Sequence, residues 1–538
     1  MLQKVARVRR WLRAQSRAQL GYHVATGLLL VLGVVFRSRR YWIDPIGLWG
    51  DEASWARRLF HASLTDFEFR PLGYMDLTRL AVHIYCDERT IRILSYVAGL
   101  ASLVLVLDIG RYLFRSRSAR LLCLAVIAFH PLLIDMAREF KPYSVEFCAH
   151  LGLVWLFLRW RASATRGRFC ALLLCSALTF LFAYNIVFVL PAIFGLLGVR
   201  FSYEKAYRRL LVTVLAACAT LALIAGVYFG LLRQMGSSDD SEKFWGGKYD
   251  VFYLADTPNK APQSRASWLA HKYVDLIEFP DVQRSRWVFP ESVSPGVSSA
   301  LVAVSYYAWL ALHAVGLVSL FLRGRREWLV LLVTPILLVM AFNGFGLWPF
   351  GVFRANTFLL SYYALIPLVG LDALTSWVGR FGPFVAAAGY LLIVLPNLTV
   401  GFDSHGRKNF FTGQSEARTV LRRLKALRER APMAARQEKS YVLLDWYSCA
   451  PFEFETSRND STRREFGRYL LDNFDFECTR TPRGMQGFMR KLRGKSFFVV
   501  VTDDRAKPAT RNLLQKETTL LDEEQVRGTH DLYYATGN

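Results

Sequence analysis

The sequence predicts a polytopic α-helical membrane protein of about eleven transmembrane helices, followed by a small mixed α/β domain. Hydrophobic residues fill 53% of the 538 positions and the mean hydropathy is +0.22, which is too apolar for a soluble enzyme of this size. Apolar windows of about 20 residues recur as far as residue 402. The composition turns charged and polar from Asp403 onward. We therefore expect two domains, a transmembrane module over 1–402 and an α/β domain over 403–538.

The predicted spans share a run of mostly apolar residues long enough, or nearly so, to cross a bilayer. No small-residue cleavage site follows the first of them, so we interpret it as an uncleaved anchor. The spans lie near 20–36, 91–113, 121–136, 145–158, 169–184, 186–199, 210–232, 300–322, 328–347, 357–374 and 383–402.

Basic residues mark every second connection between these spans, and short basic loops stay in the cytoplasm. The marked segments are the N-terminus and the connections near 111–120, 159–168, 200–209, 323–326 and 380. This orientation code explains most of the net charge of +24, so no nucleic-acid partner is required. We expect a multi-pass protein of the inner (cytoplasmic) membrane with a cytoplasmic N-terminus and a periplasmic, extracytoplasmic C-terminal domain. The segments 37–90, 136–144, 233–299 and 347–356 then face outward.

Arg37, Arg39 and Arg40 break this charge pattern, because they lie at the outward end of the first span. Ordinary headgroup anchoring explains them, and so does a local role in holding a lipid phosphate.

The C-terminal segment carries signals of both helix and strand. Ala417, Val420, Leu421 and Leu424 share one face of a predicted helix. Apolar runs at 441–444 and 497–502 predict strands. Cys449 and Cys478 lie in this domain and are able to form a disulfide, although two cysteines are weak evidence for one.

An adjacent acid pair, Asp51 and Glu52, lies just after the first span and is followed by Arg57 and Arg58. If the segment after Gly50 is helical, the helix dipole favours the ionised acids at its N-terminus. An ionised carboxylate is able to serve as a general base. The alternative is that the pair only caps a surface helix or neutralises the nearby arginines.

Two further outward connections carry cations. Arg138, Lys141 and Tyr143 lie between the third and fourth spans, and Arg354 lies between the ninth and tenth. Arginine holds a phosphate well because its guanidinium donates two parallel hydrogen bonds. The alternative is that Arg138 and Lys141 reach to lipid headgroups. Arg354 would likewise be a membrane anchor, with its aromatic neighbours forming an interfacial belt. For the polar residues His130, Asp135, Asn185 and Asn343, a hydrogen bond between helices is the expected role.

The order of these motifs resembles the GT-C glycosyltransferases that use polyprenyl-phosphate sugars. The resemblance is strongest to the protein O-mannosyltransferase and aminoarabinose-transferase superfamily, which includes bacterial lipopolysaccharide-core transferases. It rests on short motifs: Asp51-Glu52, the segments 70–74, 89–95 and 130–144, the sequence Trp348-Pro349-Phe350-Gly351 with Arg354, and the strand-like segment 441–447.

The resemblance implies inverting transfer of a sugar (hexosyl or pentosyl) from a polyprenyl-phosphate donor to a hydroxyl of a glycan, lipid or protein acceptor. By the resemblance Asp51 is the base and Glu52 supports it. Arg57, Arg58, Arg138, Lys141, Tyr143 and Arg354 then bind the substrate, and the cations among them stabilise the leaving phosphate.

Alternative functions remain open from the sequence. A lipid-linked-sugar translocase more often has mid-membrane charges and broken helices in matching halves, and neither is evident here. A scaffold in a polysaccharide assembly complex is the third reading. A divalent metal at Asp51 and Glu52 is conceivable, but two adjacent acids are too few to predict one, so we expect no certain cofactor.

Overall fold

In the computed structural model two compact units are distinguished by their internal contacts. The first unit comprises 1–39, 68–75 and 92–405, and the second comprises 40–67, 76–91 and 406–538. We describe each unit by itself. The structure describes residues 17–43, 48, 50–61, 70–85, 87–230, 252–253, 264–277, 295–351, 354–382, 384–385, 387–388, 417–430, 439–445, 452, 468–479, 482–492, 495–501, 507–526 and 530–537.

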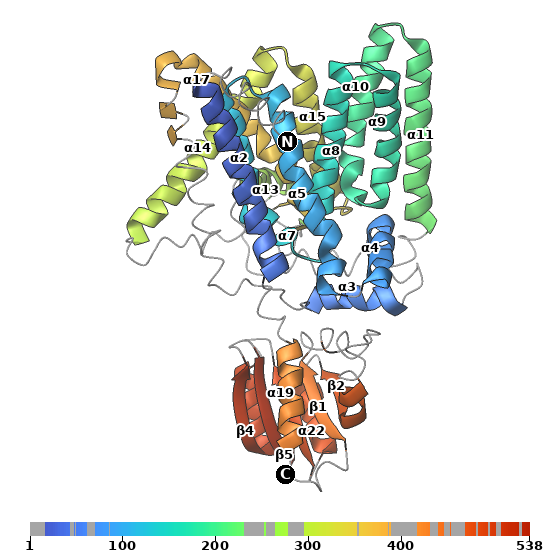
Figure 1. The fold of residues 1–538 in the computed structure, drawn as a ribbon, viewed down its shortest axis with the longest axis vertical. Helices are drawn as coiled ribbons and strands as arrows, with labels where there is room; N and C mark the ends of the chain where they lie inside the picture. The colour runs from blue at the N-terminus through green and yellow to red at the C-terminus, as the bar shows by residue number, and fades with distance from the viewer. Residues whose placement is uncertain are drawn as a thin grey trace, which may run out of the picture. The chain divides into compact units, whose positions relative to one another are not determined.

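The first unit is helical, and ten of the predicted spans correspond to helical segments within it (Figure 1). Its helices are α2 (Arg17–Ser38), α5 (Glu88–Leu113), α6 (Arg117–Phe129), α7 (Pro131–Met136), α8 (Tyr143–Ala162), α9 (Arg166–Leu178), α10 (Leu190–Tyr203), α11 (Tyr207–Gly230), α13 (Arg265–Ile277), α14 (Pro295–Leu322), α15 (Arg326–Gly344), α16 (Leu360–Tyr363) and α17 (Leu365–Trp377), with 3₁₀ segments η3 (Thr179–Leu181), η4 (Tyr184–Phe188), η7 (Arg354–Leu359) and η8 (Gly379–Phe381). The eleventh predicted span, 383–402, falls almost wholly outside the described residues.

Within the described part of the chain, six helical segments are long and apolar enough to cross a membrane, which makes this a multi-pass membrane protein. They are Gln19–Ser38, Glu88–Leu113, Tyr184–Tyr203, Tyr207–Gly230, Arg326–Gly344 and Ala355–Trp377.

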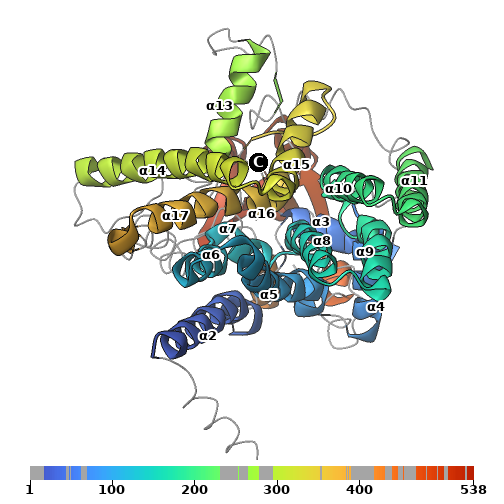
Figure 2. The ribbon, with the colours of Figure 1, turned by 90° about the horizontal axis from the view of Figure 1, so that it is seen from above.

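Helices α14 and α17 cross closely and lie side by side (Figure 2). Two glycines face the crossing. A Cβ added at Gly316 would lie 2.1 Å from the Ile366 carbonyl oxygen, and one at Gly370 would lie 2.0 Å from that of Leu312. Small residues allow such approach because, between membrane helices, packing of the backbones replaces the hydrophobic driving force.

The third predicted span is divided into α6 and α7 by His130, which adopts an extended conformation, and by Pro131. Arg37 of α2 completes the end of α6: its Nη1 donates to the Ala128 carbonyl at 2.9 Å and its Nη2 to that of Ile127 at 2.9 Å. These carbonyls belong to the last turn of α6, where carbonyl oxygens have no amide donor within the helix. The interpretations of Arg37 as a headgroup anchor or a phosphate ligand are therefore wrong, because the side chain is 1% exposed and bonded to the protein backbone.

The second unit contains a five-stranded sheet in the order β2-β1-β3-β5-β4. Strand β1 pairs in parallel with β2 and β3, and β5 runs antiparallel to both β3 and β4. The bounds are β1 (Ser440–Asp445), β2 (Phe474–Thr479), β3 (Ser496–Val501), β4 (Thr518–Val526) and β5 (His530–Gly537), with helices α3 (Gly50–His61), α19 (Ala417–Arg430), α22 (Pro482–Lys491) and α23 (Lys507–Glu517) also in this unit and α4 (Leu72–Ile84) shared with the first.

Side chains alternate between the two faces of this sheet. Val442 and Leu444 of β1 pack with the apolar face of α19, where the predicted residues Val420, Leu421 and Leu424 are all buried. The intervening Leu443 packs on the other face with residues of α22 and α23. The predicted helix and both predicted strands are therefore present.

Cys478 of β2 is disulfide-bonded. Cys449, the partner considered from the sequence, lies outside the described residues.

Candidate functional site

The segment after Gly50 is helical: α3 begins at Gly50, which places Asp51 and Glu52 in its first turn. Glu52 is fully buried, and with Ala56 and Leu59 it forms the packed stripe of the helix at spacings of four and three residues. The side chains of Asp51, Arg57 and Arg58 lie outside the described residues. Glu52 is therefore a buried carboxylate on the packed face of a short helix.

The other end of α3 is fixed to α4 within the same unit. Arg79 of α4 donates from its Nε to the Leu59 carbonyl oxygen at 3.1 Å, in the last turn of α3. Acids at the N-terminus and a cation at the C-terminus both suit the helix dipole. The backbone that carries Asp51 and Glu52 is thus held at its far end by a charged hydrogen bond.

In the first unit, the segment from Arg70 to Tyr74 is clamped by a single tyrosine. The Tyr184 hydroxyl donates to the Arg70 carbonyl at 3.1 Å and accepts from the Leu72 amide at 3.2 Å. Gly73 fits closely against this region, since an added Cβ would lie 3.1 Å from Leu181 Cβ. The Arg70 side chain is 5% exposed.

Tyr74 joins this segment to the predicted basic connection 136–144. Its ring stacks on Phe140 with centroids 5.6 Å apart, and its hydroxyl lies 3.1 Å from Ser95 Oγ. Ser95 in turn donates to the Lys141 carbonyl at 2.8 Å. The segments 70–74 and 136–144, which are far apart in the sequence, therefore lie side by side.

The cations of the 136–144 connection differ in their surroundings. Arg138 forms an ion pair with Asp135 and donates from Nε to the Ile134 carbonyl at 3.1 Å. Lys141 is buried, and Tyr143, half-buried, opens α8 directly after Pro142 at the N-cap. The Arg138 guanidinium thus has a carboxylate partner, and Lys141 lies buried on the same connection.

The loop that leads to Arg354 is held by two asparagines. Asn356, fully buried, accepts from Trp348 Nε1 at 3.0 Å and donates to the carbonyls of Pro349 at 3.1 Å and Gly351 at 2.9 Å. Asn343 donates to the Trp348 carbonyl at 2.9 Å. Arg354 is the first residue of η7, and its side chain lies outside the described residues.

Helix α8 begins at Tyr143, in the connection 136–144, and it contacts η7, which begins at Arg354. The two predicted basic connections are therefore linked through α8. Phe358 of η7 stacks on His150 of α8 at 4.5 Å between centroids and on Phe188 at 5.8 Å. Trp348 meets Phe188 at 5.3 Å. The Trp-Pro-Phe-Gly motif thus forms part of an aromatic cluster around His150.

The sequence reasoning missed a buried polar network at this point. His150 Nδ1 lies 2.7 Å from the Tyr362 hydroxyl, and Nε2 lies 3.2 Å from Asn185 Oδ1. Glu146, one turn before His150, is 6% exposed. The available signal was two ionisable residues four positions apart within an apolar window, which is costly in a membrane.

Of the four polar residues expected to bond between helices, Asn185 does so, with His150 of α8. Asp135 pairs with Arg138, three residues later, and Asn343 bonds to the Trp348 carbonyl, five residues later, so both of these contacts are local. The expectation is wrong for His130. Both of its ring nitrogens are buried without a hydrogen-bond partner among the residues the structure describes.

The described residues contain no group of three or more histidine, cysteine, aspartate or glutamate side chains arranged as metal ligands. Since the Asp51 side chain is not among them, this finding leaves a metal at the acid pair untested.

The chain resembles solved structures of GT-C glycosyltransferases. One is the aminoarabinose transferase ArnT from Cupriavidus metallidurans in the apo state, at 12% identity and a TM-score of 0.39, covering 96% of this chain and 98% of that one. The same ArnT bound to undecaprenyl phosphate has a TM-score of 0.36 at 13% identity, covering 95% and 97%. The archaeal oligosaccharyltransferase AglB from Archaeoglobus fulgidus, in complex with an inhibitory peptide and a dolichol-phosphate, has a TM-score of 0.43 at 13% identity, covering 95% of this chain and 74% of that one.

No protein-family model matches the sequence, and no curated protein matches it significantly. ArnT and AglB are both GT-C glycosyltransferases, the class that the motifs resemble, but TM-scores below 0.5 at this identity assign no role to any residue.

Proposed function

We propose that this protein is an inverting glycosyltransferase that moves a sugar from a polyprenyl-phosphate donor to an acceptor hydroxyl. The observation that carries the proposal is the acid pair in the first turn of α3, with Glu52 on the packed face of that helix. In this proposal the reaction occurs on the outer face of the cytoplasmic membrane, with the N-terminus in the cytoplasm. The acceptor is a hydroxyl of a glycan, a lipid or a protein.

The proposed step balances without a cofactor. Asp51 takes the proton of the acceptor hydroxyl while its oxygen attacks the anomeric carbon from the face opposite the phosphate. The carbon–oxygen bond to phosphate breaks, and the phosphate leaves with the electron pair. Glu52 positions the helix turn that carries Asp51, and no residue needs to protonate the leaving group because phosphate is already a stable anion.

The leaving charge requires cations. Lys141, with Arg138 beside it, is supported by its location on a connection fixed through Ser95 and Tyr74. Arg354 is supported by the rigid loop that Asn356 holds. Arg57, Arg58 and Tyr143 complete the proposed substrate-binding set. A second version of the proposal adds a divalent metal ion bound by Asp51 and Glu52.

The test compares Asp51→Asn and Glu52→Gln with Asp76→Asn, a matched control at an exposed carboxylate on α4. Each full-length variant is purified with its bound lipid, the lipid is weighed by mass spectrometry, and transfer to envelope extract is followed as a mass shift. We expect Asp51→Asn to retain the lipid and lose transfer by at least about 100-fold, the lower range for a general base, with the control unchanged. Wild-type transfer by an inserted, lipid-bound Asp51→Asn protein would refute the assignment.

A translocase of lipid-linked sugars is the second candidate, and one observation favours it: Glu146 and His150 are ionisable and buried inside the helical unit. Buried ionisable groups mark substrate pathways in transporters. Flipping of a fluorescent polyprenyl-phosphate sugar by the purified chain in vesicles, unaffected by Asp51→Asn and lost in Glu146→Gln, would establish this function instead.

A further inference from the structure

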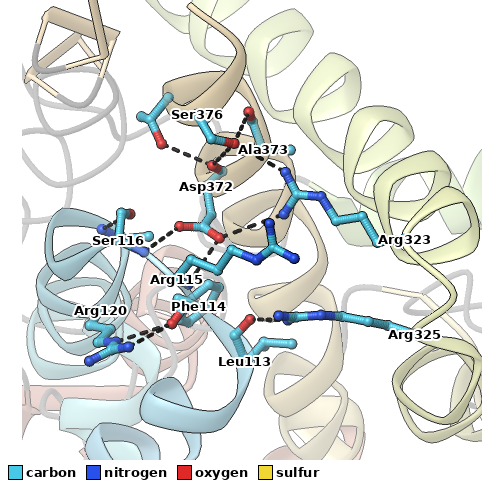
Figure 3. A network of polar contacts seen from close by, with 12 residues as sticks. Leu113, Phe114, Arg115, Ser116, Arg120, Arg323, Arg325, Asp372, Ala373 and Ser376 are labelled. Carbon is cyan, nitrogen blue, oxygen red and sulfur yellow. Dashed lines mark hydrogen bonds and ion pairs between the residues drawn. The ribbon is translucent and has the colours of Figure 1, made fainter. Parts of the chain in front are cut away.

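Three connections of the first unit meet at one buried carboxylate, Asp372 of α17, which is 3% exposed (Figure 3). Its oxygens accept from the backbone amides of Arg115 at 3.1 Å and Ser116 at 2.8 Å, at the start of α6. Arg323, after α14, lies 4.0 Å from the same carboxylate and donates to Ser376 Oγ at 3.1 Å. The acceptor capacity of Asp372 is thus largely used by backbone amides.

The arginines around Asp372 are held by carbonyl oxygens rather than by carboxylates. Arg325 donates to the Leu113 carbonyl at 2.7 Å, and Arg120 donates to that of Phe114 from Nε at 3.1 Å and Nη2 at 3.0 Å. Leu113 ends α5, so these cations suit the negative end of its dipole. A carbonyl oxygen orients an arginine through a hydrogen bond, but it has no net charge and so does not neutralise the arginine.

Positive charge is therefore concentrated here. The side chains of Arg115, Arg323 and Arg325 extend toward one another in Figure 3, with Asp372 as the single carboxylate drawn among them. Burial, and then the charges of Arg115 and Arg323, lower the pKa of Arg325. Like charges in such an arrangement repel unless an anion lies between them.

Other arginines on connections predicted to face the same side do have acidic partners. Arg161 pairs with Glu327 at 2.7 Å, and Arg159 pairs with Asp108 at 3.2 Å. Among the described residues, the Arg115 side chain makes no such pair and is exposed. The rule that basic loops stay in the cytoplasm accounts for arginines in these connections. It does not explain why the arginine side chains lie close to one another.

Exposed apolar side chains border the cluster on both helices that carry it. Phe321 and Leu322 end α14 at 63% and 70% exposure, and Trp377 ends α17 at 59%. Phe381, in the turn that follows, is 50% exposed. Cations between helix ends, bordered by exposed aromatic and aliphatic groups, match a ligand with an anionic head and apolar chains.

We propose that Arg115, Arg323 and Arg325 form a binding site for the phosphodiester headgroup of an anionic glycerophospholipid, whose acyl chains lie against the ends of α14 and α17. The headgroup would add an anion to a cluster in which Asp372 already pairs with Arg323. The site uses none of the residues placed in the transfer reaction, so it stands whether or not the protein is a glycosyltransferase.

The test measures lipid binding by the full-length protein in neutral detergent, using native mass spectrometry with phosphatidylglycerol as the probe and phosphatidylcholine as the neutral reference. Arg115→Gln is the principal variant, because only the backbone of Arg115 is bonded to Asp372. A charge near a membrane surface contributes about 1 kcal/mol to binding an anionic lipid, which is about fivefold in affinity. We expect about fivefold weaker phosphatidylglycerol binding for Arg115→Gln and about 25-fold for Arg115→Gln with Arg323→Gln.

Arg208→Gln is the matched control, since Arg208 is an exposed arginine of α11 on a connection predicted to face the same side. Its phosphatidylglycerol affinity should equal that of the wild type. The unfolding midpoint without lipid separates folding damage from lost binding. Equal losses in Arg115→Gln and Arg208→Gln would reduce the site to general surface charge and overturn the proposal. Equal competition by inorganic phosphate at the concentration of the lipid would also overturn it, by showing a soluble-phosphate site.

Discussion

Replacing either glycine at the α14–α17 crossing with alanine should destabilise the helical unit. The Cβ of Gly370→Ala would lie 2.0 Å from the Leu312 carbonyl oxygen, whereas real Cβ contacts shorter than 3.0 Å essentially never occur. One helix must therefore move by at least about 1 Å along the contact, and overpacking of this kind costs about 1–3 kcal/mol. Alanine gains up to about 1 kcal/mol in helix propensity over glycine, which offsets only part of the cost. Gly316→Ala should behave alike, because its Cβ would lie 2.1 Å from the Ile366 carbonyl oxygen.

The assay is the thermal unfolding midpoint of the full chain in detergent. Gly198→Ala in α10 is the matched control, since an added Cβ there meets nothing within 4 Å and only the propensity gain remains. The two crossing variants should unfold at lower temperature than the wild type, and the control should unfold at the same or a higher temperature. If Gly370→Ala and Gly198→Ala shifted the midpoint equally, the close crossing of α14 and α17 would be refuted.

Three further predictions concern single side chains. Arg37→Met should lower the free energy of unfolding by about 2–3 kcal/mol, because it leaves the last carbonyls of α6 without a donor; an unchanged denaturation midpoint would contradict the capping role. Asn356→Ala removes three hydrogen bonds of the loop, so it should accelerate amide exchange across 348–356 and reduce sugar transfer. Asn343→Ala removes one hydrogen bond and should have a smaller effect. Equal exchange rates in the two variants would argue against Asn356 as the main support of the loop. Burial, Asp531 and Glu523 raise the pKa of Tyr533, so its stabilising effect is fully present below the unfolded value of about 10 and is lost as pH rises through the higher folded value. Tyr533→Phe should therefore flatten the loss of stability of the sheet above pH 10, measured by exchange of β5 amides, and an unaltered pH profile would rule this out.

The sequence predicted the features that depend on side-chain periodicity. The packed face of α19 and the strands β1 and β3 follow directly from apolar spacing, which decides what is buried. The helix after Gly50 was supposed rather than predicted, without an argument from periodicity; α3 begins there and holds the acid pair in its first turn.

The sequence did not predict contacts whose partner is the backbone. Arg37 bonds to backbone carbonyls about ninety residues away. Every residue has a backbone carbonyl, so the sequence does not indicate which one an arginine contacts. Tyr184 clamps the segment 70–74 in the same manner. The network around His150 was different, because Glu146 and His150 are four residues apart in an apolar span and a search for ionisable pairs there would have found them.

The capping of α6 by Arg37 has a consequence for the order in which the chain is assembled. A helix end in a membrane needs its last carbonyls satisfied, and here the donor is carried by the first span of the chain. That span is synthesised about eighty residues earlier, so it is already available when α6 enters the bilayer. Deleting it would remove more than an anchor: α6 would insert with unsatisfied carbonyls at the bend into α7, the helix that leads to the basic connection. The N-terminal helix thus acts as an assembly partner for a region it does not adjoin in the sequence.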